Sequence, residues 1–180
     1  MGTATRTTSD TTTTWSIDPG HSNVEFAVKH LMISSVKGRF GINSGALQLN
    51  DADPSKTTVE IEIDAASVDT RQEQRDNHLR SADFFNAAEF PKMTYKSTGV
   101  AFSGDNPMTI DGNLTLLGVT KPLQLTVERF KCNPAQGTGK ERCGGNATGK
   151  LKRSDFGMKT GIPNLGDEVT LLIMFEALKD

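Results

Sequence analysis

Apolar and polar residues alternate along most of this 180-residue chain. The clearest run spans 58–64, where Val59, Ile61 and Ile63 alternate with acidic side chains. Such a period of two is typical of a strand with one buried face. Comparable runs occupy 24–30, 36–49, 93–102, 108–116, 123–128, 147–153 and 169–178. Because turn residues join them and no βαβ spacing occurs, the pattern predicts about eight antiparallel strands closed into an all-β barrel.

One stretch breaks the alternation and predicts a short helical insertion that flanks one side of the barrel. Thr70 and Glu73 have the spacing of a capping box, in which a hydroxyl and a carboxylate each accept a backbone N–H of the first turn. The helix is expected to end near Arg80. Phe84 and Phe85 follow as an apolar anchor.

Four polar residues in this stretch admit two interpretations. Asp76, His78, Arg80 and Asp83 lie within eight residues. In the catalytic interpretation a histidine, His78 or His30, acts as a general base beside one of the carboxylates. In the structural interpretation the four residues tie a polar helix to the sheet by ion pairs and hydrogen bonds.

The N-terminal residues 1–14 form a Thr/Ser-rich tail, and residues 15–180 form one domain of ordinary size. The tail is too polar to offset chain entropy by burial, so we predict that it is disordered. No apolar segment follows its single basic residue, Arg6, as a signal peptide requires. We therefore expect a cytoplasmic protein, or a periplasmic or secreted one if an export signal has been removed.

Charge and composition exclude several classes of partner. The net charge of −2 comes from 22 acidic and 20 basic residues, without a basic block, so neither nucleic acid nor an anionic membrane surface is an expected partner. The chain has no run of 18 apolar residues that would cross a membrane. The run 169–178 is apolar on both faces and predicts a possible homodimer contact.

Two cysteines flank a predicted hairpin loop. Cys132 and Cys143 would face each other across it, where a disulfide would stabilise the fold by about 3 kcal/mol in an oxidising compartment. In a reducing cytosol they would be free thiols. No histidine or further cysteine lies at metal-ligand spacing, so we predict no metal site.

Several sequence motifs, in order, resemble those of the YceI-like family of lipocalin-like barrels, described as polyisoprenoid-binding proteins. The similarity runs from Trp15 through nearly the whole domain. Its motifs are Trp15-Ser16-Ile17-Asp18 with His21-Ser22, Val24 to His30, Gly38-Arg39-Phe40, Ser67 to Thr70, Arg75 to Phe85, Phe90-Pro91, Gly112 to Thr115, and Arg153 to Gly157. The resemblance implies an eight-stranded antiparallel barrel, a helix across one side, and a long apolar isoprenoid or similar lipid in the lumen.

The strand pattern is consistent with such a ligand. Small residues on the inward face, among them Gly112 and Gly149, are expected to leave room. Each buried methylene contributes about 0.8 kcal/mol, so an apolar chain binds without special polar contacts. The candidate wall, which is alternatively plain core, comprises Phe26, Val28, Phe40, Ile42, Val59, Ile61, Ile63, Leu114, Leu116, Leu125, Ile173 and Phe175. The candidate head-group contacts, which are alternatively structural groups, are His30, Tyr95 and Arg153.

Three functions follow as hypotheses. The first is non-catalytic binding, storage or transport of an isoprenoid lipid, including a quinone or its precursor, with no other cofactor. The second is an isomerase or hydrolase acting on an apolar substrate in the same lumen, although the chain has no nucleophile elbow and no phosphate-binding loop. The third is an interaction module with a filled barrel.

His21 lies in a turn, and its side chain is expected to form a hydrogen bond with the backbone.

Overall fold

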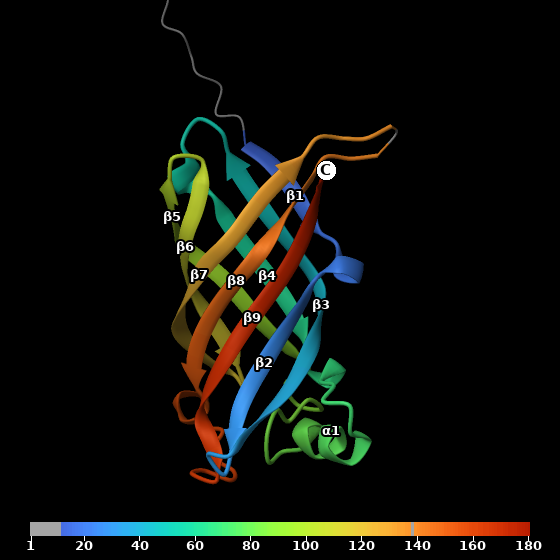
Figure 1. Cartoon of the computed structure of the whole chain (residues 1–180), viewed down its shortest axis with the longest axis vertical. Coiled ribbons are helices and arrows are strands. Elements are labelled where there is room, and N and C mark those ends of the chain that lie inside the picture. Colours follow the sequence, from blue (N-terminus) through green and yellow to red (C-terminus); the bar gives the residue numbers. More distant parts are fainter. Residues whose placement is uncertain (1–11, 138) are drawn as a thin grey trace, which may run out of the picture.

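The computed structural model describes residues 12–137 and 139–180, and one antiparallel sheet closes into a barrel there (Figure 1). The strands are β1 Thr12–Ile17, β2 Asn23–His30, β3 Ser34–Asn50, β4 Thr58–Asp64, β5 Lys92–Ser103, β6 Asn106–Leu116, β7 Val119–Asn133, β8 Arg142–Lys152 and β9 Leu165–Lys179. The helices are α1 Glu73–Arg80 and the short 3-10 turns η1 Pro19–His21, η2 Pro54–Lys56, η3 Ala65–Ser67 and η4 Arg153–Phe156. The predicted all-β fold with one α-helical insertion is confirmed.

The barrel has eight strand positions, one of which is shared by β1 and β2. The order β3-β2-β9-β8-β7-β6-β5-β4 closes through the β3–β4 pairing. β2 pairs with residues 34–41 of β3, whereas β1 pairs with residues 46–50 of β3 and with residues 177–179 of β9. The eight-stranded barrel is therefore confirmed, with β1 as an extra short strand.

The long strand β3 bends at an irregularity predicted from its glycines. Its pairing with β4 shifts register between Ile42 and Ser44. Before this bulge Phe40 points to the buried face. After it Leu47, an odd number of residues further on, points to the same face. At Gly45 an added Cβ would lie 2.7 Å from the Ile17 side chain, so close contact with β1 requires glycine there.

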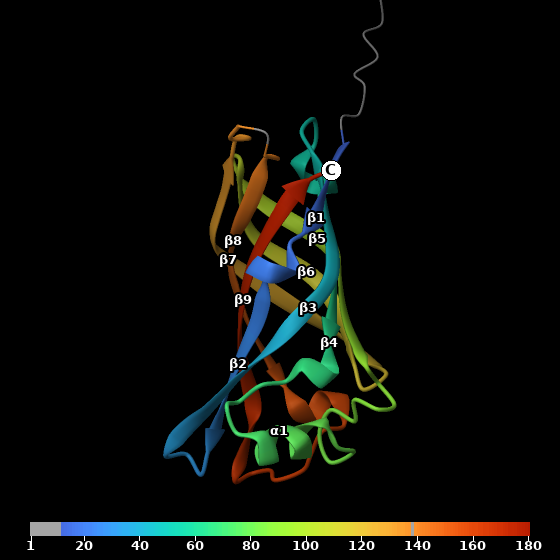
Figure 2. The same ribbon diagram turned by 90° about the vertical axis from the view of Figure 1, so that its right-hand side faces the viewer.

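The two ends of the barrel differ, and we call them lower and upper as in Figure 1. The lower end holds α1, the β2–β3 turn at 31–33 and the loop 157–164, which Figure 2 shows side by side. The upper end holds the β7–β8 loop, which the Cys132–Cys143 disulfide joins at its base, and the C-terminus. The two cysteines lie directly opposite each other in the β7–β8 pairing, as predicted.

Some predicted boundaries are wrong. The tail predicted over 1–14 ends earlier, because Thr12 to Thr14 pair with residues 48–50 of β3; residues 1–11 lie outside the described part of the chain. β9 begins at Leu165 rather than Val169, because Leu165 pairs with His30. The predicted homodimer is not tested by a single chain and stays a prediction.

In the part of the chain that the structure describes, no helix combines the length and the apolar character needed to span a membrane.

Candidate functional site

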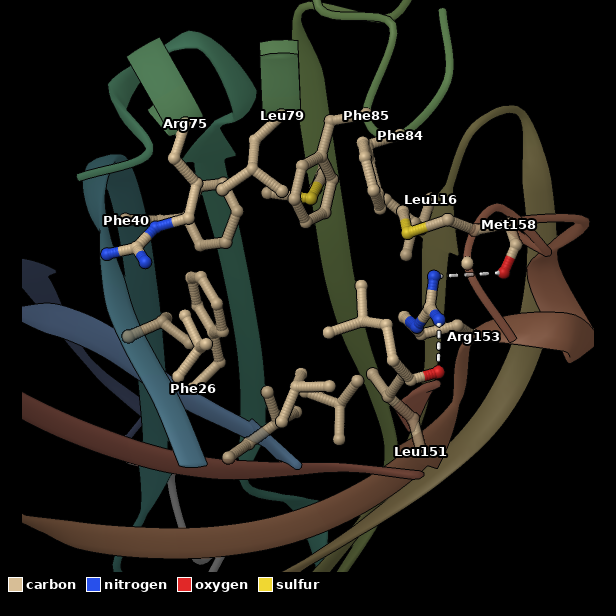
Figure 3. A pocket seen from close by; sticks show the side chains of 18 of the residues that line it. Phe26, Phe40, Arg75, Leu79, Phe84, Phe85, Leu116, Leu151, Arg153 and Met158 are labelled. Atoms are coloured by element: carbon tan, nitrogen blue, oxygen red, sulfur yellow. Dashed lines mark hydrogen bonds between the residues drawn. The ribbon is translucent and has the colours of Figure 1, made fainter. Parts of the chain in front are cut away.

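A cavity of about 470 Å³ opens at the lower end of the barrel, beneath the segment that carries α1 (Figure 3). We call it the lower cavity. Strands β2 and β3 and the residues after α1 supply its aromatic side chains. The lining comprises Val24, Phe26, Val28, His30, Val36, Phe40, Ile63, Arg75, His78, Leu79, Phe84, Phe85, Met93, Leu114, Leu116, Leu151, Arg153, Met158, Gly161, Asn164, Leu165, Val169 and Leu171.

Three phenylalanines form a continuous apolar wall between the sheet and the helical segment. The rings of Phe26 and Phe40 lie 5.4 Å apart, and Phe85 meets Phe40 edge-on at 4.9 Å. We call α1, the residues after it up to Phe85, and the loop 157–164 together the cover. Figure 3 shows Phe26 and Phe40 from the barrel wall and Phe85 from the cover pointing toward one another. Such aromatic pairs contribute about 0.5–1.5 kcal/mol beyond area burial, so they fix the cover on the barrel.

Helix α1 is held by polar contacts other than the predicted capping box. Gln72 is the N-cap and its side chain accepts the Arg75 N–H, so the prediction that Thr70 and Glu73 cap the helix is wrong. Thr70 instead donates its backbone N–H and its hydroxyl to the buried Asp76 carboxylate, at 2.8 and 2.5 Å. Arg75 donates to the Thr70 hydroxyl and carbonyl oxygens. The hydroxyl is therefore used within a buried network.

The four residues of the predicted polar cluster do not converge. Arg80 donates to the carbonyl oxygens of Ala66 and Val68, which holds the end of α1 against the segment leading to it. Asp76 bonds Thr70, whereas the exposed His78 lies 2.8 Å from Asp83 and edge-on to the Phe84 ring. Asp76 and Arg80 therefore position the cover, while His78 and Asp83 form a separate pair at the cavity mouth.

Arg153 is buried in the cavity wall and its donors are used by a loop. Its guanidinium donates to the carbonyl oxygens of Met158, Thr160, Leu165 and Gly166. Burial lowers the pKa of Arg153, while nearby Asp167 raises it. The pKa of Asp167 is itself lowered, chiefly because Ser154 donates its hydroxyl and its backbone N–H to the carboxylate. Arg153 thus closes the 157–166 loop over the cavity, and the structural alternative for this residue fits.

The free polar edge of the lower cavity lies at its mouth. His30 is exposed at the end of β2, and Asn164 lies across from it in the loop. His78 and Arg75 approach from α1. These side chains surround the opening, whereas the deeper wall is apolar except for Arg153.

A second, smaller cavity of about 260 Å³ lies at the upper end. We call it the upper cavity. Tyr95 is buried, and its hydroxyl donates to the Leu123 carbonyl at 2.9 Å and lies 3.3 Å from that of Ile110. Burial, with a smaller effect of Asp111, raises the pKa of Tyr95 well above its ordinary value. The residue lines neither cavity, so its hydroxyl serves the barrel wall rather than a head group.

The space that we expected beside the inward glycines is filled by neighbouring side chains. An added Cβ on Gly112 would lie 2.5 Å from the Tyr95 ring, and one on Gly149 would lie 2.8 Å from Leu125. Each glycine therefore accommodates a large neighbour instead of leaving space. The open volume lies between the lower ends of the strands and the cover, both of which line it.

The predicted site residues fall into three groups. The lower cavity holds Phe26, Val28, His30, Phe40, Ile63, Leu114, Leu116 and Arg153. The upper cavity holds Val59 and Phe175. Buried residues that line neither cavity are Ile42, Ile61, Tyr95, Leu125 and Ile173.

The sequence interpretation missed the residues that close the cavity. Val24 shares the inward parity of Phe26, so strand alternation alone would have found it. Leu79 and Phe85 come from the helical segment, Met158 comes from the loop 157–164, and Leu165 begins β9. Leu165 has the parity of Val169, but no periodic signal marks Met158, because its position depends on contacts of a loop.

A separate polar cluster lies outside the barrel wall. His21 Nδ1 lies 2.8 Å from Asp18, so the prediction that this side chain bonds backbone is wrong. The pKa of Asp18 is lowered, chiefly by the bond with His21. Asp18, His21 and Glu176 have the spacing of metal ligands, but Arg142 donates to both carboxylates. Its positive charge already occupies the position between them.

Comparison with known proteins places this barrel in context. The profile of the YceI-like domain matches residues 15–177. Protein YceI of Salmonella newport is 40% identical over 159 residues, 88% of this chain and 82% of that protein. The crystal structure of a Campylobacter jejuni YCEI protein is 35% identical, with a TM-score of 0.68 over 84% of this chain and 90% of the other. A polyisoprenoid binding domain from Saccharophagus degradans is 17% identical, with a TM-score of 0.64 over 92% of this chain and 98% of the other.

Proposed function

The chain belongs to the YceI-like family, and from that premise we propose that its lower cavity binds an isoprenoid or similar amphiphilic lipid. The observation that carries the proposal is an open volume of about 470 Å³ with an almost entirely apolar wall. This volume falls within the range of about 300–1,000 Å³ that is typical of small-molecule sites. An open volume also disfavours the filled-barrel alternative. The polyisoprenoid ligand named for the Saccharophagus degradans domain is consistent with an apolar chain here.

The volume limits the length of chain that is buried. An apolar cavity of about 150 Å³ holds one benzene ring, so the lower cavity holds about three such volumes. That corresponds to about 15–20 carbon atoms, or three to four isoprene units. A longer chain would extend through the mouth.

The polar head of the lipid would face the mouth. His30 and His78 lie there, whereas Arg75 donates to Thr70, and Arg153 donates to loop carbonyl groups. A hydroxyl, phosphate or quinone oxygen would reach these side chains or water. Burial of the chain supplies the affinity, and the mouth sets the orientation.

We infer a non-catalytic role in storage or transport. The only histidine at the cavity with a described carboxylate partner, His78, is exposed beside Asp83. Exposure keeps this pair in water rather than against the apolar part of a substrate. The inference predicts that His78→Ala retains ligand binding; loss of a measurable turnover with binding intact would instead support the enzyme alternative.

The disulfide supports an oxidising compartment. A Cys132–Cys143 bond is stable in an oxidising environment, which favours the periplasmic or secreted location over the cytoplasmic one. Thiol alkylation of protein taken directly from cells, followed by mass measurement, tests this inference. Two alkylated cysteines would contradict it.

The binding proposal is tested by a matched pair of substitutions. Val28 and Val59 are both buried on strands, but Val28 lines the lower cavity and Val59 the upper one. In native mass spectrometry and in titrations with farnesol and geranylgeraniol, Val28→Phe should weaken binding by about tenfold or more, because the added ring occupies ligand volume. Val59→Phe should bind as the unaltered protein does. Equal effects of both, or no uptake by the unaltered protein, would refute the assignment.

A further inference from the structure

Three consecutive exposed apolar side chains form the tip of the β2–β3 hairpin. Leu31 is 49% exposed, Met32 73% and Ile33 85%. In the described part of the chain, the other exposed large apolar residue is Met108, at 48%. Single exposed apolar residues are ordinary, but a contiguous group at one projecting tip is not.

The backbone conformation of this tip does not favour large apolar residues. Leu31 and Met32 have φ values of 53° and 58°, in the left-handed region where glycine and asparagine are favoured. Large side chains there are unfavourable for the backbone and, being exposed, unfavourable in water. A contact with another apolar phase would account for both.

The tip lies beside the mouth of the lower cavity. Figure 2 shows the hairpin reaching outward from the barrel at the end that holds α1. The Leu31 backbone N–H donates to the Asn164 carbonyl at 2.6 Å, which joins the tip to the 157–164 loop. His30, immediately before the tip, and Asn164 both line the cavity.

The two segments that form and adjoin the tip carry basic rather than acidic side chains, although Asp155, Asp167 and Glu168 border them. From residue 26 to residue 50 the sequence has no Asp or Glu, but it has Lys29, Lys37 and Arg39. Arg39 lies 4.0 Å from Asp69, whereas Lys29 and Lys37 form no ion pair in the described ranges. Between residues 156 and 166 the one charged side chain is that of Lys159. Basic residues around an apolar tip match the phosphate layer over the acyl layer of an anionic bilayer.

We propose that the tip Leu31–Ile33 inserts into the surface of an anionic phospholipid bilayer and places the mouth of the lower cavity against it. A lipid chain would then pass between bilayer and cavity with little exposure to water. Docking itself depends on the tip and its basic residues. The transfer of lipid rests on the proposed function.

Vesicle flotation of the full chain tests docking. We compare the unaltered protein, the double variant Met32→Ser, Ile33→Ser, and the control Met108→Ser at the upper end. On vesicles of phosphatidylcholine with phosphatidylglycerol, the double variant should partition at least about tenfold less, because burial of one large apolar side chain corresponds to an order of magnitude or more. Met108→Ser should partition as the unaltered protein does. Vesicles of phosphatidylcholine alone should bind all three more weakly.

Flotation of the double variant equal to that of the unaltered protein would overturn the proposal. So would an unaltered protein that floats with neither kind of vesicle. If light scattering then showed a dimer that the double variant abolishes, the tip would be a contact with a second copy, and the membrane proposal would be wrong.

A separate readout distinguishes this proposal from the proposed function. Farnesol uptake from dilute solution and the thermal midpoint should be the same in the double variant and the unaltered protein. Flotation without farnesol uptake would refute the lipid-binding proposal and leave docking intact. Uptake without flotation would do the reverse.

Discussion

The lower and upper ends of this barrel are closed by different means. At the upper end β1 pairs with both β3 and β9, and the Cys132–Cys143 disulfide joins the β7–β8 hairpin. The lower end is covered by α1 and a loop, which side chains such as Arg80 and Arg153 hold through backbone carbonyl groups. The larger cavity lies under this second kind of cover.

The difference shows where an eight-stranded barrel obtains its free volume. In the middle layer Tyr95 fills the space beside Gly112, and Leu125 fills that beside Gly149. Both contacts join neighbouring paired strands, β5 with β6 and β7 with β8, so the large side chain of one strand occupies the space that the glycine of the next leaves. A helix and a loop span the opening without adding inward side chains at every second residue, so space remains beneath them.

Removal of the hydrogen bonds from Arg153 to the loop should have the largest effect on stability. Arg153→Met leaves four carbonyl groups without their donor, and we expect the free energy of unfolding to fall by about 4 kcal/mol, since bonds to a charged donor contribute about 1.5–3 kcal/mol each and the loop relaxes. Urea denaturation measures this change. Farnesol binding should fall with it, because Met158 and Leu165 leave the wall. Arg129→Met, an exposed arginine on β7, is the control and should change stability little.

Removal of the disulfide should have the next largest effect and should act on the other end. The double variant Cys132→Ser, Cys143→Ser opens a loop of 11 residues in separation, which corresponds to a loss of about 3 kcal/mol. Denaturation under non-reducing conditions gives the value. Binding of farnesol to the folded protein should not change, because the bond borders the upper cavity. Weaker binding would mean that the two ends are coupled.

A glycine pair sharpens the comparison in the middle layer. Gly112→Ala places a Cβ 2.5 Å from the Tyr95 ring and 2.7 Å from the Lys96 carbonyl, so we expect a loss of about 2 kcal/mol. Gly99, on the paired strand β5, has no atom within 4 Å of an added Cβ, and Gly99→Ala should be neutral or stabilising by about 0.5 kcal/mol. Thermal unfolding of both variants decides the point. Equal midpoints would mean that the ring moves freely.

Alternating residues such as those of β4 sufficed to predict the barrel from the sequence, since each strand buries one face along its own length. β1 was missed because its threonines bury little until Trp15, and its pairing depends on two distant strands. The lower cavity was predicted in part, through Phe26 and Phe40. Its cover was not, because it depends on how Arg153 and Thr70 distribute their hydrogen bonds after folding.

The smallest effect concerns the acid limb of stability at the lower end. Because Ser154 lowers the pKa of Asp167 in the folded protein, its carboxylate stabilises the loop above the ordinary aspartate pKa of about 3.9, and this contribution is lost as the pH falls through the lower folded pKa. Asp167→Asn should therefore be less stable than the unaltered protein at neutral pH, and the gap should narrow below about pH 4. Asp155→Asn, on an exposed neighbour, should show no such narrowing. Denaturation at a series of pH values measures both gaps. If the stability difference between Asp167→Asn and the unaltered protein stays constant with pH, the charge of Asp167 does not contribute to its bonds with Ser154. The electrostatic contribution to holding the loop would then come from Arg153.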